Sequence, residues 1–217
     1  MVEEYQQKNC VPPFRLFVLG DSISEGYGPS LETFGRGFFT YARKTGAEPG
    51  LPEAGLPGVG GGGDSAAVLA YLRFRAETGG IPADLLLLNC GLHDLRTDPA
   101  TGAHQIPLDQ YGANLREILG VVKSMGLQPV WVTITPVLES VHNGPDRPFH
   151  RFNRDLDAYN ATAREIMLAG GALVLDLHAF TANLGPEVFT DGVHFVPEAS
   201  AFQAAFLVGS LVSGSSD

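Results

Sequence analysis

The first apolar run of the chain ends in a polar turn, within the sequence Phe14-Arg15-Leu16-Phe17-Val18-Leu19-Gly20-Asp21-Ser22. Arg15–Leu19 lacks the polar alternation of a half-exposed strand, which is typical of a strand buried on both faces of a parallel sheet. Gly20-Asp21-Ser22 follows directly. We therefore expect Ser22 where a strand passes into a helix, at an N-terminus whose backbone N–H groups stabilise developing negative charge.

Three further short runs have the same character and are bounded by Gly, Pro or Asp. They are Leu85–Cys90, Val130–Ile134 and Leu173–Leu177. Segments with the apolar spacing of helices lie between and after them, at Ser65–Glu77, Leu108–Met125, Asn153–Ala169 and Pro197–Val212. This alternation predicts an α/β fold, a three-layer α/β/α sandwich with a central parallel sheet of about five strands.

Two long loops interrupt this pattern. Glu48–Gly63 is rich in Gly and Pro and leaves room for one short extra strand. Glu139–Phe152 is polar and follows the carboxyl end of a strand, where ligands bind and long loops line active sites. Its charged side chains either contact substrate or belong to a solvated loop. They are His142, Arg147, His150 and Arg151.

The composition limits the partners and the location of the protein. The 217 residues carry 14 Lys and Arg against 24 Asp and Glu, a formal charge of −10. That balance argues against a surface for nucleic acid or anionic lipid, which needs clustered cations. The polar start of the chain shows no signal peptide, and no apolar run reaches transmembrane length. We expect a cytoplasmic protein (or a secreted or periplasmic one whose leader has been removed), with a tail over residues 1–13, one domain over 14–217, and an oligomeric state left open.

A second group of chemistry-bearing residues lies between the last strand and the closing helix, at Asp191-Gly192-Val193-His194. A serine hydroxyl becomes nucleophilic when a base takes its proton, and an imidazole base needs a partner that fixes its tautomer. His194 is a candidate base and Asp191, three residues earlier, is its candidate partner. The alternative is a helix-capping aspartate beside an ordinary surface histidine.

Two further turns bear on the assignment of the serine. Gly63-Asp64-Ser65 repeats the Gly-Asp-Ser tripeptide, so the tripeptide alone does not identify a nucleophile, and Asp21 or Ser22 could equally cap a helix. Gly91-Leu92-His93-Asp94 ends the strand Leu85–Cys90 and projects from the same edge of the sheet. It either reaches a bound acyl group or forms a turn with a structural aspartate. Three signals at strand ends together favour a catalytic site at that edge.

In these blocks the sequence resembles the SGNH (GDSL-like) hydrolase family, most clearly over Phe14–Gly26 and Thr190–Phe195. The resemblance implies a catalytic set of Ser22 as nucleophile, His194 as base and Asp191 as its orienting carboxylate. It also implies a flavodoxin-like three-layer fold and ester hydrolysis through an acyl-enzyme, without a cofactor or a metal.

The two middle blocks match the family less closely. Gly63 corresponds to the glycine whose amide joins the oxyanion hole, with Gly60 to Gly62 as alternatives, and Ser65 then starts a helix. His93 stands where the family has an asparagine that donates to the oxyanion. An imidazole can donate an N–H, so either His93 replaces that donor or the hole relies on the Ser22 and Gly63 amides. Asp94 is expected to stabilise the loop and orient His93, as Asp21 supports the serine turn.

The resemblance also bears on the substrate, a small-molecule ester or an acylated sugar. Cys90-Gly91-Leu92-His93-Asp94-Leu95 with the downstream Thr135-Pro136-Val137 is similar to bacterial carbohydrate-type esterases. This predicts hydrolysis of short acyl esters, chiefly O-acetyl groups on a carbohydrate. A broad short-chain esterase, a lysophospholipase or a thioesterase is the alternative with the same chemistry.

Three other functions stay open. Gly58–Gly63 fits the G-x-G-x-x-G pattern but does not follow a strand, as a dinucleotide site requires. A metal hydrolase would use side chains of zinc-binding type, and chelator sensitivity would distinguish it. Its ligands would be His93, Asp94, Asp191 and His194. The third alternative is an inactive carbohydrate-binding module, because the family's asparagine is absent.

Overall fold

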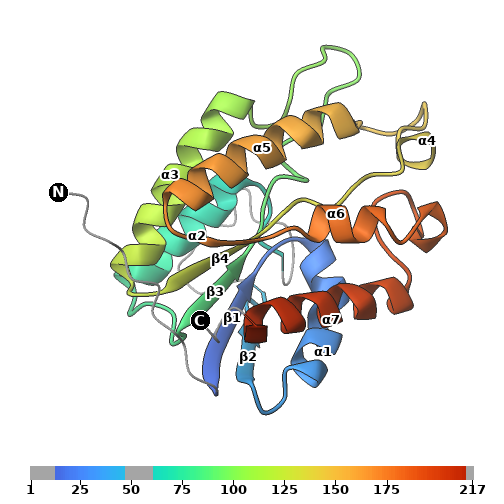
Figure 1. Cartoon of the computed structure of the whole chain (residues 1–217). Coiled ribbons are helices and arrows are strands. Elements are labelled where there is room, and N and C mark those ends of the chain that lie inside the picture. Colours follow the sequence, from blue (N-terminus) through green and yellow to red (C-terminus); the bar gives the residue numbers. More distant parts are fainter. Residues whose placement is uncertain (1–12, 47–60, 214–217) are drawn as a thin grey trace.

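A computed structural model describes residues 13–46 and 61–213 of the chain. Within them, five parallel strands form one sheet in the order β2-β1-β3-β4-β5 (Figure 1). The strands are β1 (Phe14–Leu19), β2 (Phe39–Arg43), β3 (Leu85–Leu88), β4 (Gln128–Val132) and β5 (Leu173–Leu175). This order is that of the flavodoxin-like sheets.

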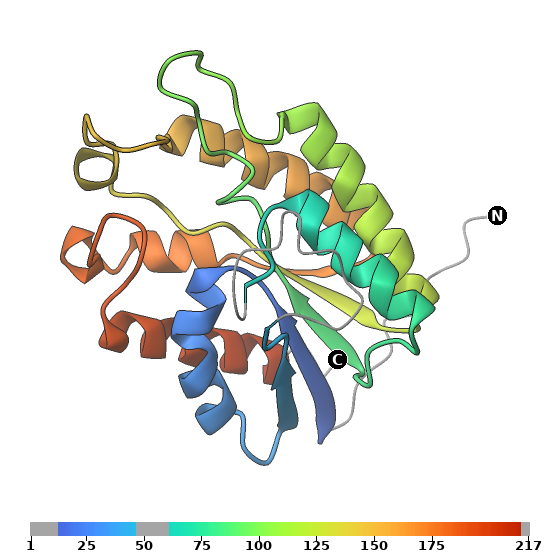
Figure 2. The ribbon, with the colours of Figure 1, turned by 180° about the vertical axis from the view of Figure 1, so that it is seen from behind.

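Helices cover both faces of the sheet, as the two opposite views show (Figures 1 and 2). One face carries α1 (Ser22–Phe34), α6 (Leu177–Ala182) and α7 (Pro197–Ser213), and α7 packs against both of the others. The other face carries α2 (Ser65–Glu77), α3 (Leu108–Ser124) and α5 (Asn153–Ala169), with α3 between its neighbours. The predicted α/β/α sandwich is confirmed. Two short elements lie in connecting loops, α4 (Glu139–His142) and the 3-10 turn η1 (Pro186–Val188).

The central strands are apolar because both of their faces are covered. All four residues of β3 are buried leucines, and Leu87 pairs with Val18 of β1 on one side and Val130 of β4 on the other. Trp131 of β4 is fully buried in the same core. The four predicted strands and four predicted helices are all present, with small shifts at their ends.

The fifth strand was not located in advance. It is β2, at an edge of the sheet, where Phe39 is buried and Thr40 is exposed. The sequence predicts room for an extra strand in Glu48–Gly63, but residues 48–60 of that loop, like the tail over residues 1–12, lie outside the described residues. None of the described helices is both long enough and apolar enough to cross a membrane.

Parallel strands bring their carboxyl ends to one edge of the sheet, and that edge carries the polar turns. Gly20-Asp21-Ser22 follows β1, and Gly91-Leu92-His93-Asp94 follows β3. The Gly62 amide donates to the Gly20 carbonyl at 2.7 Å. This bond ties the segment before α2 to the end of β1, so the block around Gly63 lies beside the block around Ser22.

Candidate active site

Ser22 is the first residue of α1, and its position is fixed by its neighbours. The buried Asp21 caps the helix, because its carboxylate accepts the Ile23 amide at 3.0 Å. Burial raises the pKa of Asp21, and the hydrogen bond from Ile23 offsets part of that effect. Gly20 lies so close to Asn89 that a Cβ atom would come within 2.1 Å of the Asn89 Oδ1. The strand-to-helix turn therefore has room only for glycine before Asp21.

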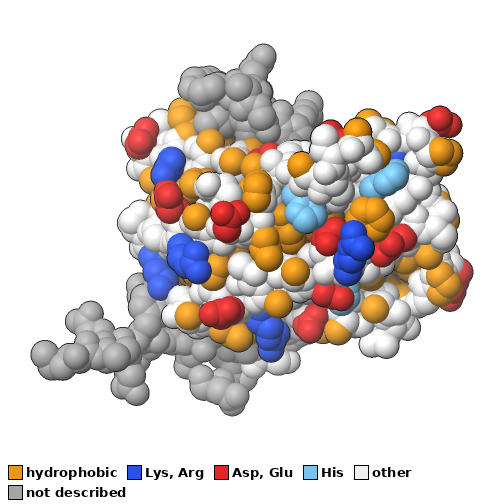
Figure 3. All heavy atoms as spheres, turned by 90° about the horizontal axis from the view of Figure 1, so that it is seen from above, with side chains coloured by type: hydrophobic (Ala, Val, Ile, Leu, Met, Phe, Trp, Pro, Cys, Tyr) orange, Lys and Arg blue, Asp and Glu red, His pale blue; other side chains and the backbone are white. Residues whose placement is uncertain are grey.

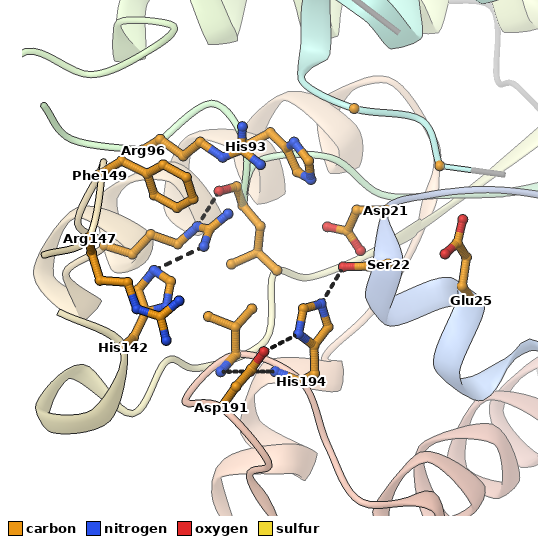
Figure 4. A pocket seen from close by; sticks show the side chains of 15 residues that line it. Asp21, Ser22, Glu25, His93, Arg96, His142, Arg147, Phe149, Asp191 and His194 are labelled. Carbon is orange, nitrogen blue, oxygen red and sulfur yellow. Dashed lines mark hydrogen bonds and ion pairs between the residues drawn. The ribbon is translucent and has the colours of Figure 1, made fainter. Parts of the chain in front are cut away.

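A chain of hydrogen bonds links Ser22 to the loop before α7 (Figure 4). The Ser22 Oγ lies 2.8 Å from the His194 Nε2, and the His194 Nδ1 lies 2.7 Å from the Asp191 Oδ2. An ionised carboxylate only accepts hydrogen bonds, so the Nδ1 of His194 carries the proton and its Nε2 is free to accept from the serine hydroxyl. This arrangement prepares the hydroxyl to lose its proton to the imidazole.

Asp191 is held as a carboxylate by the turn that it begins. Its Oδ1 accepts the backbone amides of Val193 at 3.0 Å and of His194 at 2.8 Å. Partial burial opposes the charged form, but the hydrogen bonds from the backbone and ring of His194 and from Val193 outweigh it. They hold the pKa of Asp191 well below its usual range. The residue therefore orients His194 through both its ring and its backbone.

The short helix α4 supports this turn from behind. The Leu138 amide donates to the Gly192 carbonyl at 2.8 Å. Gly192 has a φ of +86°, and a Cβ atom there would lie 2.8 Å from the His142 nitrogen. The turn thus needs glycine for its backbone conformation and for its contact with α4. Sequence reasoning placed this segment in a loop and did not anticipate the contact.

Two backbone amides near Ser22 have no acceptor among the described residues. The Ser22 amide lies in the first turn of α1, where the helix offers no partner. The Gly63 amide has no acceptor among the described residues, and Gly63 lines the same cavity as Ser22. Gly62 donates its amide to Gly20 instead, and Gly60 lies outside the described residues. Gly63 has a φ of +76°, a conformation that glycine adopts at little cost.

His93 also reaches this cavity. Its ring points toward Asp21 and Ser22 (Figure 4) and forms no hydrogen bond with any described residue. Burial lowers its pKa to about 4, and the nearby cations Arg96 and Arg151 add to the effect. The imidazole is therefore neutral near pH 7, with one N–H to donate.

Asp94 lies elsewhere, buried beneath the loop and not on the cavity wall. Both of its oxygens lie 3.0 Å from the Ser65 amide at the start of α2. Burial raises its pKa to about 7. Within the described part of the chain it forms no hydrogen bond with His93. Its contacts fix α2 to the loop that carries His93. They do not include the expected direct contact with the His93 ring.

The cavity has a volume of about 350 Å³. Ser22 and Glu25 line one side of it, and Arg96, Arg147 and Phe149 line the opposite side (Figure 4). On the face seen from above, histidine side chains are exposed next to acidic and basic side chains (Figure 3).

Most of the charged loop residues that the sequence singled out reach the cavity. His142, Arg147 and Arg151 line it, whereas His150 does not; its ring lies 3.3 Å from the Gly144 carbonyl. Arg96 and Phe149 also line the cavity, and sequence reasoning did not name them. Arg96 follows Gly91-Leu92-His93-Asp94 by two residues, and this closeness in sequence was the available signal.

The side chains of the metal-hydrolase alternative do not converge. Asp191 and His194 bond to each other, and Asp94 is engaged with Ser65 away from the cavity. Among residues 13–46 and 61–213, no three His, Cys, Asp or Glu side chains are grouped as metal ligands. Asp191 and His194 instead belong to a hydrogen-bond chain that ends at the Ser22 hydroxyl.

Comparisons with known proteins give a consistent result. The sequence model of the GDSL-like Lipase/Acylhydrolase family matches residues 18–201, while a comparison with curated protein sequences gives no match. A GDSL-like lipase from Bacteroides thetaiotaomicron is 18% identical with a TM-score of 0.65, over 92% of this chain and 88% of that one.

Two esterase structures are similar to the same degree. One is an acetyl xylan esterase, 16% identical with a TM-score of 0.62, over 90% of this chain and 98% of that one. The other is a psychrotrophic esterase from Pseudoalteromonas sp., in a structure inhibited by monoethylphosphonate. It is 14% identical with a TM-score of 0.62, over 92% of this chain and 97% of that one. At such identities the likeness concerns the fold.

Proposed function

Since the chain belongs to the GDSL-like lipase/acylhydrolase family and is a carboxylic ester hydrolase, we propose that it works as a serine esterase with Ser22 as its nucleophile. The observation that carries the proposal is the hydrogen-bond chain from the Ser22 Oγ through His194 to Asp191, at 2.8 and 2.7 Å. It opens onto a cavity and lies at a helix N-terminus, where an oxyanion is stabilised.

The reaction follows from this arrangement. The Ser22 Oγ attacks the ester carbonyl carbon while the His194 Nε2 takes the hydroxyl proton. The amides of Ser22 and Gly63, with the neutral ring of His93, donate to the oxyanion. His194 then passes the proton to the oxygen of the leaving alcohol, and the acyl group stays on Ser22. Water attacks the acyl-enzyme with His194 again as base, and the acid departs.

For the substrate, we infer short acyl esters, chiefly O-acetyl groups on a carbohydrate. The proposal rests on the sequence similarity of the His93 block to carbohydrate-type esterases and on the fold shared with an acetyl xylan esterase. A cavity of about 350 Å³ lined largely by polar and charged side chains suits a small acyl group and a polar alcohol better than a long lipid chain.

The test is hydrolysis of p-nitrophenyl acetate, butyrate and octanoate in the presence of EDTA. We expect activity that Ser22→Ala lowers by at least about a thousandfold, the effect of removing a covalent nucleophile. Ser65→Ala is the matched control, because Ser65 belongs to the second Gly-Asp-Ser and accepts a hydrogen bond from Asn114 instead. Loss of activity with EDTA, or an inactive Ser65→Ala beside an active Ser22→Ala, would contradict the proposal.

A second readout detects the nucleophile directly. An activated alkyl phosphonate ester should add once to the wild-type protein, because the serine oxygen displaces its leaving group at phosphorus. Intact-protein mass spectrometry should show this single adduct in the wild type and in Ser65→Ala but none in Ser22→Ala. An adduct on Ser22→Ala would place the nucleophile elsewhere.

A further inference from the structure

Two arginines contact the same aromatic ring on the wall of the cavity. The guanidinium carbon of Arg96 lies 4.5 Å from the centre of the Phe149 ring, and that of Arg151 lies 4.8 Å from it. Arg151 is buried, and Arg96 is half-buried. Contacts of this kind stabilise a cation on an aromatic face, but they do not neutralise its charge.

The hydrogen bonds of Arg151 are made to neutral groups. Its Nε donates to the Leu92 carbonyl at 2.6 Å, and its Nη1 lies 3.0 Å from the His142 Nε2. His142 accepts that bond as a neutral ring, because burial and the neighbouring arginines lower its pKa to about 4. Burial likewise lowers the pKa of Arg151 to about 10, with Arg96 as a second cause. The guanidinium is thus buried beside another cation.

No carboxylate of the described residues lies within salt-bridge distance of these arginines. The carboxylates that act electrostatically on Arg96 and Arg151 have other hydrogen-bond partners. Asp64 accepts the Ala67 amide and the Gln105 side chain, Asp21 caps α1, and Asp191 holds His194. The Nε of Arg96 is buried and has no hydrogen-bond partner in the described part of the chain. Asp21 and Asp191 raise the pKa of Arg151, but burial and Arg96 outweigh them. A buried cation without a salt-bridge partner is costly, and a bound anion would lower that cost.

A third arginine completes the group. Arg147 is exposed at the mouth of the cavity, on the same side as Arg96 and Phe149 (Figure 4), and its side chain forms no hydrogen bond within the described part of the chain. Three guanidinium groups therefore line one side of a cavity whose other side holds Ser22. The positive charge on that side opposes the chain's formal charge of −10, whereas the carboxylates Asp21, Glu25 and Asp191 line other parts of the cavity.

We propose that the ester substrate carries a carboxylate, which Arg96, Arg147 and Arg151 bind across the cavity from Ser22. This inference rests on the proposed serine esterase function and adds the charge class of its substrate. Planar guanidinium groups bind carboxylates through paired, charge-assisted hydrogen bonds. The carboxylate belongs either to the acyl group or to the alcohol, for instance a uronic acid that bears an O-acetyl group.

The experiment compares two matched pairs of esters. The acyl pair is p-nitrophenyl hydrogen adipate and p-nitrophenyl hexanoate, and the alcohol pair is an O-acetylated methyl glucuronoside and the corresponding methyl glucoside. We expect the wild type to prefer the anionic member of one pair by about tenfold or more in kcat/KM, mainly through KM. The pair that shows the preference identifies which side of the ester carries the carboxylate.

The variants test whether the arginines cause the preference. Arg147→Gln and Arg96→Gln should each lower the ratio of anionic to neutral kcat/KM by about tenfold, and Arg147→Lys should retain part of it. Arg164→Gln, an exposed arginine on α5 away from the cavity, should leave both rates unchanged. A wild-type ratio near one for both pairs, or a ratio that Arg147→Gln and Arg96→Gln do not change, overturns the inference.

A binding measurement separates this inference from the catalytic proposal. Ser22→Ala should bind the anionic member of the preferred pair more tightly than the neutral one in calorimetric titration, and Ser22→Ala/Arg147→Gln should lose that difference. If wild type hydrolyses the esters through Ser22 but shows no charge preference, only the carboxylate site is wrong. If neither protein distinguishes the two esters in binding, the carboxylate site is overturned whatever the catalytic result.

Discussion

Gly192 lies against the backbone of His142 so closely that a Cβ atom at position 192 would be 2.8 Å from the His142 nitrogen and 2.9 Å from the Leu138 carbonyl oxygen. Gly192 sits between Asp191 and His194 in sequence, and α4 packs on the turn that these residues form. The geometry of the proposed base and its carboxylate is therefore supported by a helix from a different part of the chain.

This contact predicts that Gly192→Ala impairs activity more than it impairs folding. A Cβ atom must push the turn away from α4 and also strain a φ of +86°. We expect kcat/KM to fall about a hundredfold, since small displacements of reacting groups have effects of that size. The free energy of unfolding should fall by about 1–3 kcal/mol. Ester hydrolysis and urea unfolding measure the two effects.

Gly126→Ala is the control for this prediction. Gly126 has a φ of +74°, but a Cβ atom there meets nothing within 4 Å. The substitution should cost only the backbone strain, about 1–2 kcal/mol, and leave kcat/KM unchanged. Equal losses of activity in the two variants would mean that strain or global stability, and not the contact with α4, explains the effect.

We expect the negative charge of Asp191 to contribute to catalysis, in addition to the backbone hydrogen bonds that its side chain accepts. In Asp191→Asn the amide oxygen can still accept the Val193 and His194 backbone amides, but a neutral side chain no longer stabilises the imidazolium or fixes the reactive tautomer. We expect kcat to fall by about a hundredfold to ten-thousandfold, with a small change in unfolding free energy. Steady-state kinetics measures the loss of kcat, and circular dichroism checks that the variant is folded. A kcat within threefold of wild type, a difference of about 0.6 kcal/mol in activation free energy, would remove Asp191 from the mechanism.

Much of the fold could be predicted because buried parallel strands are marked by composition. Leu85–Leu88 is apolar at every position since both faces are covered, and this marks it in sequence. Phe39–Arg43 was missed because an edge strand exposes part of its surface and mixes apolar with polar residues. Its alternation of Phe39, Tyr41 and Arg43 on one side was the available signal.

The candidate site, like the fold, could be predicted from the sequence only in part. Ser22, Asp191 and His194 were named because local spacing and strand ends place them. Arg96, Phe149 and the support of Gly192 by α4 depend on how distant loops pack, and no periodicity records that. His93 and Asp94 are adjacent in sequence yet face different surroundings, one a cavity and the other the Ser65 amide.

His93 is predicted to act as an oxyanion donor. His93→Ala should lower kcat by about 30- to 1000-fold, equivalent to about 2–4 kcal/mol of lost transition-state stabilisation. His93→Asn should recover much of this loss, because the amide also offers an N–H at that position. Kinetics on p-nitrophenyl acetate decides the matter, and a near-normal rate for His93→Ala would show that the backbone amides suffice.

The protonation state of His93 leads to a separate prediction. Its pKa is lowered to about 4 by burial and by neighbouring cations, so the ring stays neutral from pH 6 to pH 9. The ratio of wild-type kcat to that of His93→Asn should then be constant over this range, since both donors are uncharged. A ratio that declines as pH rises through about 6.5 would identify a charged imidazolium as the donor.

Asp94 should make the protein less stable as pH rises, which is opposite to the usual effect of a carboxylate. Its pKa rises from 3.8 in the unfolded chain to about 7 in the folded protein, because burial disfavours the charge. The folded state therefore holds a proton that the unfolded state has lost between these values, and stability falls through that window by up to about 1.4 kcal/mol per pH unit.

Asp94→Asn removes this titration and keeps an oxygen to accept the Ser65 amide. The unfolding free energy of the variant minus that of wild type should accordingly increase from about pH 4 to about pH 7 and level off above it. His93 and His142 have pKa values lowered to about 4, so both proteins gain stability from them as pH rises, and the difference cancels this. Urea unfolding at intervals from pH 4 to pH 8 measures it. A difference that stays flat or decreases would mean that Asp94 is ionised in the folded protein throughout, with the Ser65 amide outweighing burial.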